Sequence, residues 1–406
     1  MRRLAIIAAV SAVAVICTAT ASAAGPPVPS PAGPGSVTTE ETIDLDRFAS
    51  GIHSRLDGNV VGFSYAIARN GAVVRSGADG HRRLGHDGGL LPFTADTMTQ
   101  AASTSKTTTA AALVKALYDR GLSVDSAIGA YLPRCWQKGP NVSSLTFRDV
   151  LGHHTMLPDA KGCDDDPLRC LLEMIAKGRP ARRDQGTAPY RYSNSVYGLV
   201  RVLVPFVLER VKMQRKFGRL AFRCSRRTEQ HNKLVSDRFR DYLFDEVLAP
   251  AGAVASFYPQ GAGVPDWAHL YNLADLSQPG SVPREDFHLR AGAGYLAIGA
   301  RSYARFLSAL DAGLLVPKSL VEEMKGVPGD RMGFDTSISG QLGEYVWKNG
   351  GCPSAGGTKP GCSALAVVFP NGMQAFVAVS SSNNTYAAQH GGLDDIVRDA
   401  FDEALL

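Results

Sequence analysis

Apolar and polar positions alternate in two stretches that lie near opposite ends of the chain. Residues 63–78 read FSYAIARNGAVVRSGA, two β-prone runs around Asn70-Gly71, and residues 364–381 read ALAVVFPNGMQAFVAVSS around Asn371-Gly372. Asn-Gly between two apolar runs is a strong signal for a β-hairpin, because both residues tolerate positive φ. The two stretches therefore predict one antiparallel sheet built from both chain ends.

Between the two hairpins the apolar spacing becomes helical. Residues 106–121 (KTTTAAALVKALYDRG) place apolar side chains on one helical face and end on a glycine that suits a C-cap. Similar spacing occurs in three further segments, residues 193–211, 237–248 and 302–314. The order predicts an α+β fold, in which helices flank a central antiparallel sheet and an all-helical subdomain is inserted roughly over residues 107–285. No repeat of the solenoid kind is visible.

The chain begins with the pattern of an export signal. Two arginines precede an apolar run, and an Ala-Ser-Ala cleavage pattern follows it. We predict a signal peptide over residues 1–23, a Pro/Gly-rich linker over 24–44 and a single domain over 45–406. An uncleaved anchor is the alternative, although the apolar run is short for a membrane span. After cleavage we expect a secreted, extracytoplasmic protein with no stable membrane span.

Composition adds one local feature. The chain of 406 residues is 45% hydrophobic and 20% charged with a net charge of +5, which is typical of a globular protein. Residues 201–240, however, hold twelve Lys/Arg against three Asp/Glu. This segment is either a solvated insertion or a patch that binds an acidic polymer, such as an anionic cell-wall polymer, or an anionic membrane surface. No nucleic-acid motif accompanies it, so we expect no nucleic-acid partner.

The cysteines are consistent with export. Without the signal peptide six remain, an even number that favours disulfides in an oxidising compartment. Six cysteines allow fifteen pairings, and proximity in sequence favours Cys163–Cys170 and Cys352–Cys362, which leaves Cys135 with Cys224. Buried free thiols are the alternative. There is no C-x-x-C or H-E-x-x-H motif, so we expect neither a zinc site nor another cofactor.

Candidate chemistry begins at residues 101–110, AASTSKTTTA. A serine hydroxyl needs a base within hydrogen-bond reach to become a nucleophile. Residues three apart share a helix face, so Ser103 can touch Lys106, whereas Ser105 is adjacent to the lysine and points elsewhere. Burial can lower the pKa of a lysine enough to make it a base. The spacing therefore selects Ser103 and Lys106.

Two later motifs extend this pair. Residues 190–198 (YRYSNSVYG) contain Tyr192-x-Asn194, and residues 347–352 (WKNGGC) contain Lys348-Asn349-Gly350. In this order and spacing the three motifs resemble those of the serine β-lactamase and penicillin-binding protein superfamily, in its class C-like branch. That branch includes D-alanyl-D-alanine carboxypeptidases and esterases. The similarity runs from about residue 45 to residue 400, and the basic segment is its least familiar part.

The resemblance implies a role for each residue of the first two motifs. Ser103 would attack a carbonyl carbon and form an acyl-enzyme. Lys106 and Tyr192 would share the proton transfer, with the phenolate form of Tyr192 favoured by nearby ammonium groups. Asn194 would bind a substrate amide and help to hold Lys106.

The third motif would bind substrate. Lys348 would offer a cation to a substrate carboxylate, next to Asn349 and Gly350. The oxyanion would lie between the backbone N–H groups of Ser103 and Gly351. Asn349 stands where the family carries a threonine that helps to bind the carboxylate, which weakens the case for efficient β-lactam hydrolysis.

A second departure concerns residues 151–159, LGHHTMLPD, where Met156 stands at a position at which glycine is common. Each motif residue also has an ordinary alternative: Tyr192 a half-buried aromatic, Asn194 a helix N-cap, Lys348 a solvated strand residue. Residues 292–297 (GAGYLA) mimic a dinucleotide fingerprint but lack its strand context, and we interpret them as a tight turn. No G-x-S-x-G motif supports an α/β-hydrolase.

The sequence thus predicts an exported serine hydrolase acting through acyl-Ser103. We expect its substrate to be a D-alanyl peptide, such as a peptidoglycan peptide, or a related small amide or ester. Two alternatives stay open. One is an esterase, and the other is a non-catalytic envelope-binding protein that keeps the fold and uses its basic segment to hold an anionic polymer.

Overall fold

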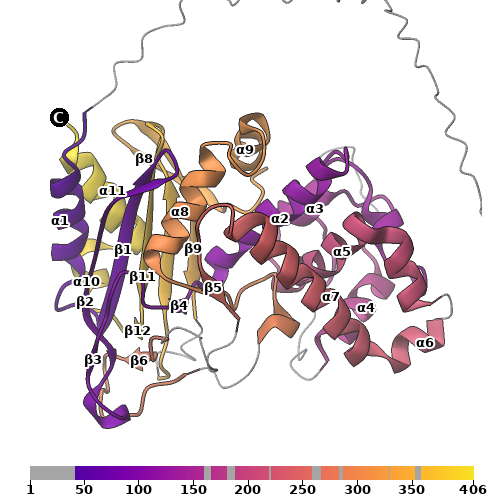
Figure 1. Ribbon diagram of the computed structural model, residues 1–406, viewed down its shortest axis with the longest axis horizontal. Helices are drawn as coiled ribbons and strands as arrows, with labels where there is room; N and C mark the ends of the chain where they lie inside the picture. The colour runs from indigo at the N-terminus through magenta and orange to yellow at the C-terminus, as the bar shows by residue number, and fades with distance from the viewer. Residues whose placement is uncertain are drawn as a thin grey trace, which may run out of the picture. The chain divides into compact units, whose positions relative to one another are not determined.

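A seven-stranded antiparallel sheet forms the core of the fold, with the strand order β3-β2-β1-β11-β10-β9-β8 (Figure 1). The computed structural model describes residues 42–159, 166–180, 188–218, 221–257, 267–282, 287–327, 329–352 and 358–406. The sheet strands are β1 (Gly62–Arg69), β2 (Ala72–Arg83), β3 (Leu91–Pro92), β8 (Thr336–Gly340), β9 (Gly343–Gly351), β10 (Ser363–Val368) and β11 (Met373–Val379). Two small sheets join β4 (Thr99–Gln100), β7 (Ala297–Ile298) and β5 (Ala255–Ser256), and β12 (Ser381–Ser382) with β6 (Tyr271–Asn272).

The predicted hairpins pair with each other at the centre of this sheet. Asn70 and Gly71, with φ of 52° and 80°, form the tight turn between β1 and β2. The turn between β10 and β11 is one residue longer, since Phe369 and Met373 close it and Gly372 takes φ of 76°. The first hairpin joins the second through β1 and β11. The prediction of one antiparallel sheet built from both chain ends is confirmed.

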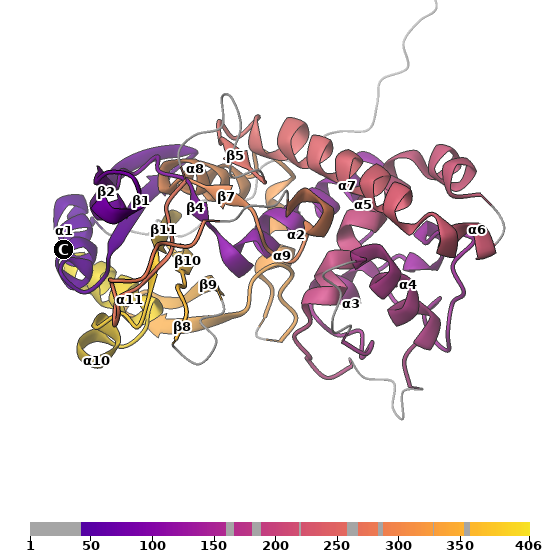
Figure 2. The ribbon, with the colours of Figure 1, turned by 90° about the horizontal axis from the view of Figure 1, so that it is seen from below.

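The helices are arranged on both sides of the sheet and beyond one edge of it (Figures 1 and 2). They are α1 (Leu45–Leu56), α2 (Ser105–Asp119), α3 (Phe147–Leu151), α4 (Pro167–Lys177), α5 (Asn194–Phe217), α6 (Ala221–Arg226), α7 (Thr228–Leu243), α8 (Ala300–Asp311), α9 (Lys318–Lys325), α10 (Tyr386–His390) and α11 (Leu393–Ala404). Helices α3 to α7 gather at the end of the molecule far from α1, α10 and α11 in both views. The α+β class with a helical part between the two halves of the sheet is confirmed.

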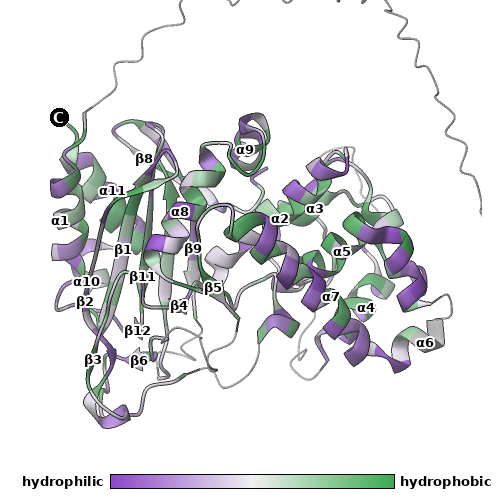
Figure 3. Cartoon of the chain, viewed as in Figure 1, coloured by the Kyte–Doolittle hydropathy of each residue, from purple (hydrophilic) through white to green (hydrophobic). Residues whose placement is uncertain are grey.

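Alternation along the strands gives the sheet two apolar faces. Phe63, Tyr65 and Ile67 of β1 pack with α1 and α11, while Ala66 and Ala68 face the core that contains α2, α5 and α8. Strand β11 is buried along its whole length. Green, hydrophobic ribbon accordingly marks the sheet and the inner sides of the helices in Figure 3. Alternate residues of one strand thus serve two separate cores.

The four predicted helices are present, with changes at their ends. Helix α2 begins at Ser105, and Gly121 lies just beyond its end with φ of 62°. Helix α5 runs to Phe217 across Pro205 and a non-helical residue, Glu209, so its last turns are set off from the rest. Helix α7 ends at Leu243 and continues as a wider π turn, and α8 spans Ala300–Asp311.

Helix α2 lies between the sheet and the helical part, and hydroxyl groups fasten it there. Thr107 Oγ1 donates to Gly333 O at 2.7 Å, and Thr109 Oγ1 donates to Gly292 O at 2.8 Å. Every residue of α2 from Ser105 to Val114 is buried. Thr107 and Thr109 therefore hold the helix to two glycine-containing turns.

Two of the three predicted disulfides are confirmed. Cys135 pairs with Cys224, and Cys352 pairs with Cys362. The third pairing involves Cys163, which lies outside the described residues, as do the predicted signal peptide (1–23) and most of the predicted linker (24–44). No helix in the described part of the chain is long and apolar enough to cross a membrane.

Candidate active site

The serine selected by spacing lies on a 3₁₀ turn, Ala102–Thr104, that leads into α2. Ala102 adopts φ of 45°, a left-handed conformation that is costly for a residue with a Cβ. The turn is closed by the neighbouring hydroxyl groups: Thr104 Oγ1 donates to Ala101 O, and Ser105 Oγ donates to Ala102 O, both at 2.6 Å. The Ser105 hydroxyl thus stabilises the turn, whereas the Ser103 hydroxyl takes no part in closing it.

Ser103 meets a lysine and a tyrosine. Its Oγ lies 3.1 Å from Lys106 Nζ and 2.7 Å from the hydroxyl of Tyr192. Lys106 Nζ also contacts Asn194 Oδ1 at 2.7 Å and Ala293 O at 2.5 Å. The first two motifs, almost ninety residues apart, therefore converge on one hydroxyl oxygen.

Burial determines the protonation states of Lys106 and Tyr192. Lys106 is fully buried, and its pKa lies well below the ordinary value, chiefly because of desolvation and then because of the positive charge of Lys348; the charge of Asp335 opposes the shift. The pKa of Tyr192 is raised, mainly by burial and also by the charge of Asp335, while the hydrogen bond that it shares with Ser103 opposes the shift. This direction is opposite to the phenolate that the resemblance implied. The site holds a lysine that readily loses its proton and a tyrosine that keeps it.

His153, which the sequence did not single out, supports Tyr192. Its ring packs against the Tyr192 ring with centroids 4.7 Å apart, and its Nδ1 accepts the backbone N–H of Ser193 at 3.2 Å. Burial, followed by the charge of Lys106, lowers the pKa of His153 to about 3. The imidazole is therefore neutral, with Nδ1 as acceptor and the other nitrogen protonated.

Asp159 fixes the start of α5, where the second motif lies. It accepts hydrogen bonds from the hydroxyls of Ser193 at 2.8 Å and Ser195 at 3.0 Å. Ser193 is the N-cap of α5, and its hydroxyl accepts from Val196 N, so Asn194 is the first helical residue rather than the cap. This capping directs the Asn194 amide to Lys106.

The third motif occupies the end of β9, and its lysine is already paired. Lys348 is 1% exposed, and its Nζ lies 2.6 Å from Asp335 Oδ2 and 2.8 Å from Asn349 O. The Asn349 N–H also points to Asp335 Oδ2, at 3.4 Å. Burial lowers the pKa of Lys348, and Asp335 opposes that shift. The cation expected for a substrate carboxylate thus has a carboxylate of its own.

The glycines after Lys348 bring β9 against the nucleophile turn. A Cβ on Gly350 would lie 2.7 Å from Ala101 O and 2.8 Å from Ser103 N, so only glycine fits there. Cys352 N donates to Cys362 O across the β9–β10 ladder, and the alternation of that ladder turns the Gly351 N–H away from β10. Gly351 and Ser103 can therefore both present N–H groups to a developing oxyanion.

Three residues of the site were not predicted from the sequence. Asp335 precedes β8 and reaches Lys348 only because β8 and β9 form a hairpin, and nothing in its local sequence marks it. His153 lies in a segment whose resemblance was noted without a role. Residues 292–297 form a turn, as interpreted, but Ala293 also supplies a carbonyl to Lys106. Among the described residues no group of three His, Cys, Asp or Glu side chains is placed to hold a metal ion.

Comparison with known proteins gives a family match over nearly the whole domain. The model of the family described as Beta-lactamase matches residues 45–399. A comparison with curated proteins found no match.

Solved structures share the fold at low sequence identity. A class C beta lactamase from Rhodobacter sphaeroides has a TM-score of 0.61 at 16% identity, covering 88% of this chain and 98% of that one. FmtA from Staphylococcus aureus has a TM-score of 0.62 at 16% identity, with 92% and 93% covered. The D-amino acid amidase from Ochrobactrum anthropi SV3, complexed with L-phenylalanine amide, has a TM-score of 0.60 at 18% identity, with 88% and 98% covered.

Proposed function

The chain belongs to the beta-lactamase family, and we propose that it is an exported serine hydrolase that forms an acyl-enzyme on Ser103. The observation that carries the proposal is the double contact on Ser103 Oγ, from Lys106 Nζ at 3.1 Å and from the Tyr192 hydroxyl at 2.7 Å. A buried amine beside a serine hydroxyl is a general base in position. The substrate proposed is a D-alanyl peptide or a related amide or ester.

The hydrogen bonds around Lys106 favour the lysine as the base. A neutral amine has two N–H groups and one lone pair. Asn194 Oδ1 and Ala293 O can only accept, so they take both N–H groups and leave the lone pair directed at Ser103 Oγ. Ser103 can then donate to Lys106 while it accepts from the Tyr192 hydroxyl.

Acylation follows from this arrangement. Ser103 Oγ bonds to the substrate carbonyl carbon as its proton moves to Lys106, and the oxyanion is held by the N–H groups of Ser103 and Gly351. Tyr192, which is protonated up to this point, donates its proton to the leaving amine or alcohol. It then regains a proton from Lys106. The bond between the carbonyl carbon and the leaving group breaks.

Deacylation reverses the roles. Water adds to the acyl carbon while the neutral amine of Lys106 accepts its proton, and Ser103 leaves as that proton is returned to its oxygen. The acid product and free enzyme result. The rate of this step distinguishes a peptidase that traps penicillin from a lactamase that releases it.

Export is the second part of the proposal. The disulfides Cys135–Cys224 and Cys352–Cys362 are of the kind that persists in oxidising compartments. They support the export signal expected over residues 1–23. Detection of the mature protein outside the cytoplasm, beginning after residue 23, tests this part.

The decisive experiment is intact-mass analysis of wild type and Ser103→Ala after exposure to penicillin, a D-Ala-D-Ala peptide and a short-chain ester. We expect an adduct or turnover in wild type and neither in Ser103→Ala. A long-lived penicillin adduct indicates a penicillin-binding peptidase, rapid return to free mass a lactamase, and turnover of the ester alone an esterase. Absence of any adduct on folded protein, with these probes and a fluorophosphonate, overturns the proposal.

The second candidate is a non-catalytic envelope-binding protein. Its support is the set of cations toward the end of α5, which includes the exposed Arg210 and Arg215. It predicts salt-sensitive binding to cell walls that Ser103→Ala leaves unchanged, with turnover near background. Turnover that depends on Ser103 excludes it.

A further inference from the structure

The pairing of Lys348 with Asp335 bears on which substrates the site accepts. The ammonium group has three N–H groups, and two of them are directed to Asp335 Oδ2 and Asn349 O. Asp335 is itself largely buried, with 17% of its side chain exposed. A cation with a carboxylate 2.6 Å away acts on a substrate as part of a dipole, whose field falls off faster than that of a lone charge.

Among the described residues, the hydrogen bonds and ring contacts of Ser103, Lys106 and Tyr192 bring in no cation other than Lys106 and Lys348. The charges of Lys348 and Asp335 act on Lys106, and the Tyr192 ring faces Lys106 Nζ at 4.8 Å and Lys348 Nζ at 5.6 Å from its centroid. Lys106 must itself be neutral to serve as base. In the competent state the charges of these three groups therefore sum to zero: Lys348 positive, Asp335 negative, Lys106 uncharged.

Asn349 is a second feature that bears on the binding of a substrate carboxylate. The family's threonine offers a hydroxyl to a substrate carboxylate, whereas here the residue is an asparagine whose backbone N–H faces Asp335. A carboxylate bound beside Lys348 would also lie near the Asp335 carboxylate, which is 2.6 Å from Lys348 Nζ. Like charges placed close together in a partly buried site are strongly unfavourable.

We infer that this site selects acyl donors that are uncharged at the position where penicillins and D-alanyl-D-alanine peptides carry a carboxylate, and that Asp335 sets this selection. The inference rests on the proposed function. It narrows the substrate class to neutral esters and amides, with Asp335 as a specificity-determining residue.

The test compares two thioesters that differ only in charge. N-acetyl-D-alanine is linked to thioglycolic acid in one and to methyl thioglycolate in the other, and release of the thiol is followed with a chromogenic disulfide. In both reactions Ser103 Oγ bonds to the carbonyl carbon, the C–S bond breaks and the Ser103 proton ends on the thiol. The acyl-enzyme is the same, so the ratio of kcat/KM reports acylation alone.

We expect wild type to prefer the methyl ester by about 10-fold or more in kcat/KM. Asp335→Asn should reduce that ratio by about 10-fold, while Asp335→Glu, which keeps the charge, should retain most of it. A structural defect would slow both thioesters alike and leave the ratio unchanged. If Asp335→Asn does not fold, the wild-type ratio and that of Asp335→Glu still decide the matter.

The outcomes separate the two proposals. If neither thioester is turned over above the Ser103→Ala background, the proposed function fails. If wild type uses both thioesters equally well, or prefers the acid, the hydrolase stands and the inferred selection is wrong. If the wild-type preference exists but Asp335→Asn leaves it intact, the role of Asp335 is wrong.

A second inference comes from a different surface, a hollow of about 510 Å³ beside the end of α5. Its lining residues are Arg134, Arg210, Val211, Gln214, Arg215 and Gly218. We call it the three-arginine hollow. It contains no acidic side chain among its lining residues, and all three arginines are exposed.

The three-arginine hollow is built on fixed parts of the fold. The buried side chain of Gln214 accepts a hydrogen bond from the backbone N–H of Arg134 at 2.8 Å and donates one to Leu132 O at 2.9 Å. Arg210 lies over the ring of Tyr131, 5.7 Å from its centroid. Arg134 is next to Cys135, whose disulfide to Cys224 joins this segment to α6.

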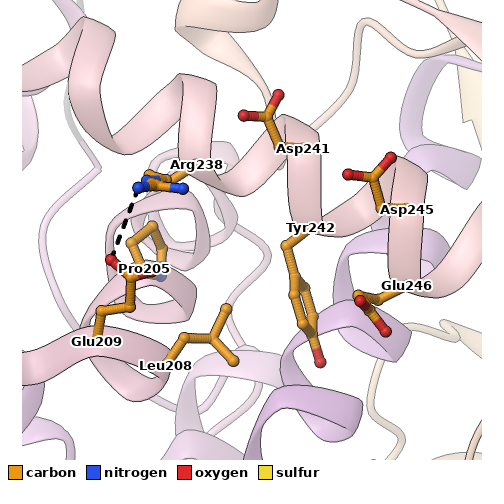
Figure 4. A pocket seen from close by; sticks show the side chains of 8 residues that line it. All are labelled: Pro205, Leu208, Glu209, Arg238, Asp241, Tyr242, Asp245 and Glu246. Carbon is orange, nitrogen blue, oxygen red and sulfur yellow. Dashed lines mark ion pairs between the residues drawn. The ribbon is translucent and has the colours of Figure 1, made fainter. Parts of the chain in front are cut away.

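Several other cations of the basic segment are paired with acids. Lys212 pairs with Glu209 at 2.8 Å, Lys233 with Asp237 at 2.8 Å, and Arg238 lies 3.9 Å from Glu209. Figure 4 shows the last pair at a separate pocket of about 190 Å³. That pocket is lined by Pro205, Leu208, Glu209, Arg238, Asp241, Tyr242, Asp245 and Glu246. No ion pair among the described residues thus includes an arginine of the three-arginine hollow.

We propose that the three-arginine hollow binds a polymer of phosphate-linked repeats. Guanidinium groups bind phosphate oxygens in a bidentate manner, and three of them around one hollow suit a phosphodiester. The exposed Arg226 and Arg227 follow Cys224 closely in the sequence, and the disulfide to Cys135 ties Cys224 to the residue next to Arg134. An extended row of cations matches a chain better than a single phosphate.

Fluorescently labelled poly(glycerol phosphate) and sodium polyphosphate are suitable probes, with neutral dextran as the uncharged polymer. The variant Arg134→Ser/Arg210→Ser/Arg215→Ser is compared with Lys212→Ser/Lys233→Ser/Arg238→Ser, which removes the same charge from the paired cations. We expect the first triple variant to weaken binding of poly(glycerol phosphate) by about 10-fold or more and the second to change it by less than about 3-fold. Dextran should not bind.

Equal loss in both triple variants would mean that net charge alone attracts the polymer, and the inferred site would be wrong. Absence of binding by wild type at about 0.15 M salt would also overturn it. Preference for polyphosphate over poly(glycerol phosphate) by more than tenfold would show that the hollow takes a phosphoanhydride chain rather than a phosphodiester-linked polymer, and the inferred occupant would be wrong. Single Arg215→Ser, an exposed change, serves where the triple variant does not fold.

Discussion

At the scale of single residues, Lys106 links burial to chemistry. Its partners are Ser103 Oγ, Asn194 Oδ1 and Ala293 O, and the two carbonyl oxygens orient the amine so that its lone pair meets the serine. Spacing alone predicts the contact with Ser103. The contacts with Asn194 and Ala293 depend on chain segments about 90 and 190 residues away, which local sequence patterns do not bring together.

The pH dependence of acylation should follow the charges around Lys106. Activity rises with pH as Lys106 loses its proton, so the acid limb of kcat/KM reports its pKa. Lys348→Met removes a positive charge that lowers this pKa, so the limb should move to higher pH. Asp335→Asn removes a negative charge that raises it, so the limb should move to lower pH. The check is kcat/KM for a neutral ester from pH 5 to pH 10; parallel shifts in the two variants would contradict the assignment.

The two serines of the nucleophile turn should behave differently. Ser103→Ala removes the nucleophile, and no acyl adduct should form. Ser105→Ala removes only the hydrogen bond to Ala102 O, with a cost in the free energy of unfolding of about 1 kcal/mol. Intact mass after a neutral ester or fluorophosphonate, together with urea unfolding, distinguishes them. Loss of the adduct in a folded Ser105→Ala protein would contradict the assignment of Ser103 as the nucleophile.

At the scale of elements, the site depends on two strands that the sequence did not predict. Residues 364–381 predict β10 and β11, but β8 and β9 lie in a polar, glycine-rich stretch with little alternation. Their hairpin nevertheless brings Asp335 to Lys348 and the end of β9 to the nucleophile turn. Pairing with β10 and β8, rather than intrinsic preference, makes β9 a strand.

Adjacent glycines at the end of β9 offer a matched pair of variants. In Gly350→Ala the new Cβ would meet Ala101 O at 2.7 Å and Ser103 N at 2.8 Å, so β9 or the nucleophile turn must move. Since loss of an oxyanion donor typically costs about 100-fold or more in kcat, we expect a decrease of that order. In Gly351→Ala the nearest atom is Cys362 O at 3.8 Å, and most of the activity should remain. Steady-state kinetics and a far-UV spectrum check both; similar losses in the two variants would contradict the steric argument.

At the scale of the whole molecule, patterning predicted the class and left the assembly of the helical part open. The two Asn-Gly hairpins predict that the chain ends share a sheet, because each hairpin alone would expose one apolar face. The four predicted helices are those with strong apolar periodicity. Helix α6 contains Cys224, whose disulfide partner Cys135 lies 89 residues back in the chain, and a local pattern does not encode this bond. The interruption of α5 at Glu209 has no local signal of its own either.

The two disulfides should therefore act at different levels. Cys135–Cys224 joins residues 89 apart in the helical part, and loop-closure entropy predicts a loss of about 4 to 5 kcal/mol in unfolding free energy for Cys135→Ala/Cys224→Ala. Cys352–Cys362 spans 10 residues, which predicts about 3 kcal/mol, but it adjoins Gly351 and holds the end of β9. We expect its removal to lower kcat more than removal of the longer bridge does. Urea unfolding and ester kinetics on both double variants test this, and a larger loss of kcat without Cys135–Cys224 would show that the helical part, rather than the end of β9, controls the geometry of the oxyanion site.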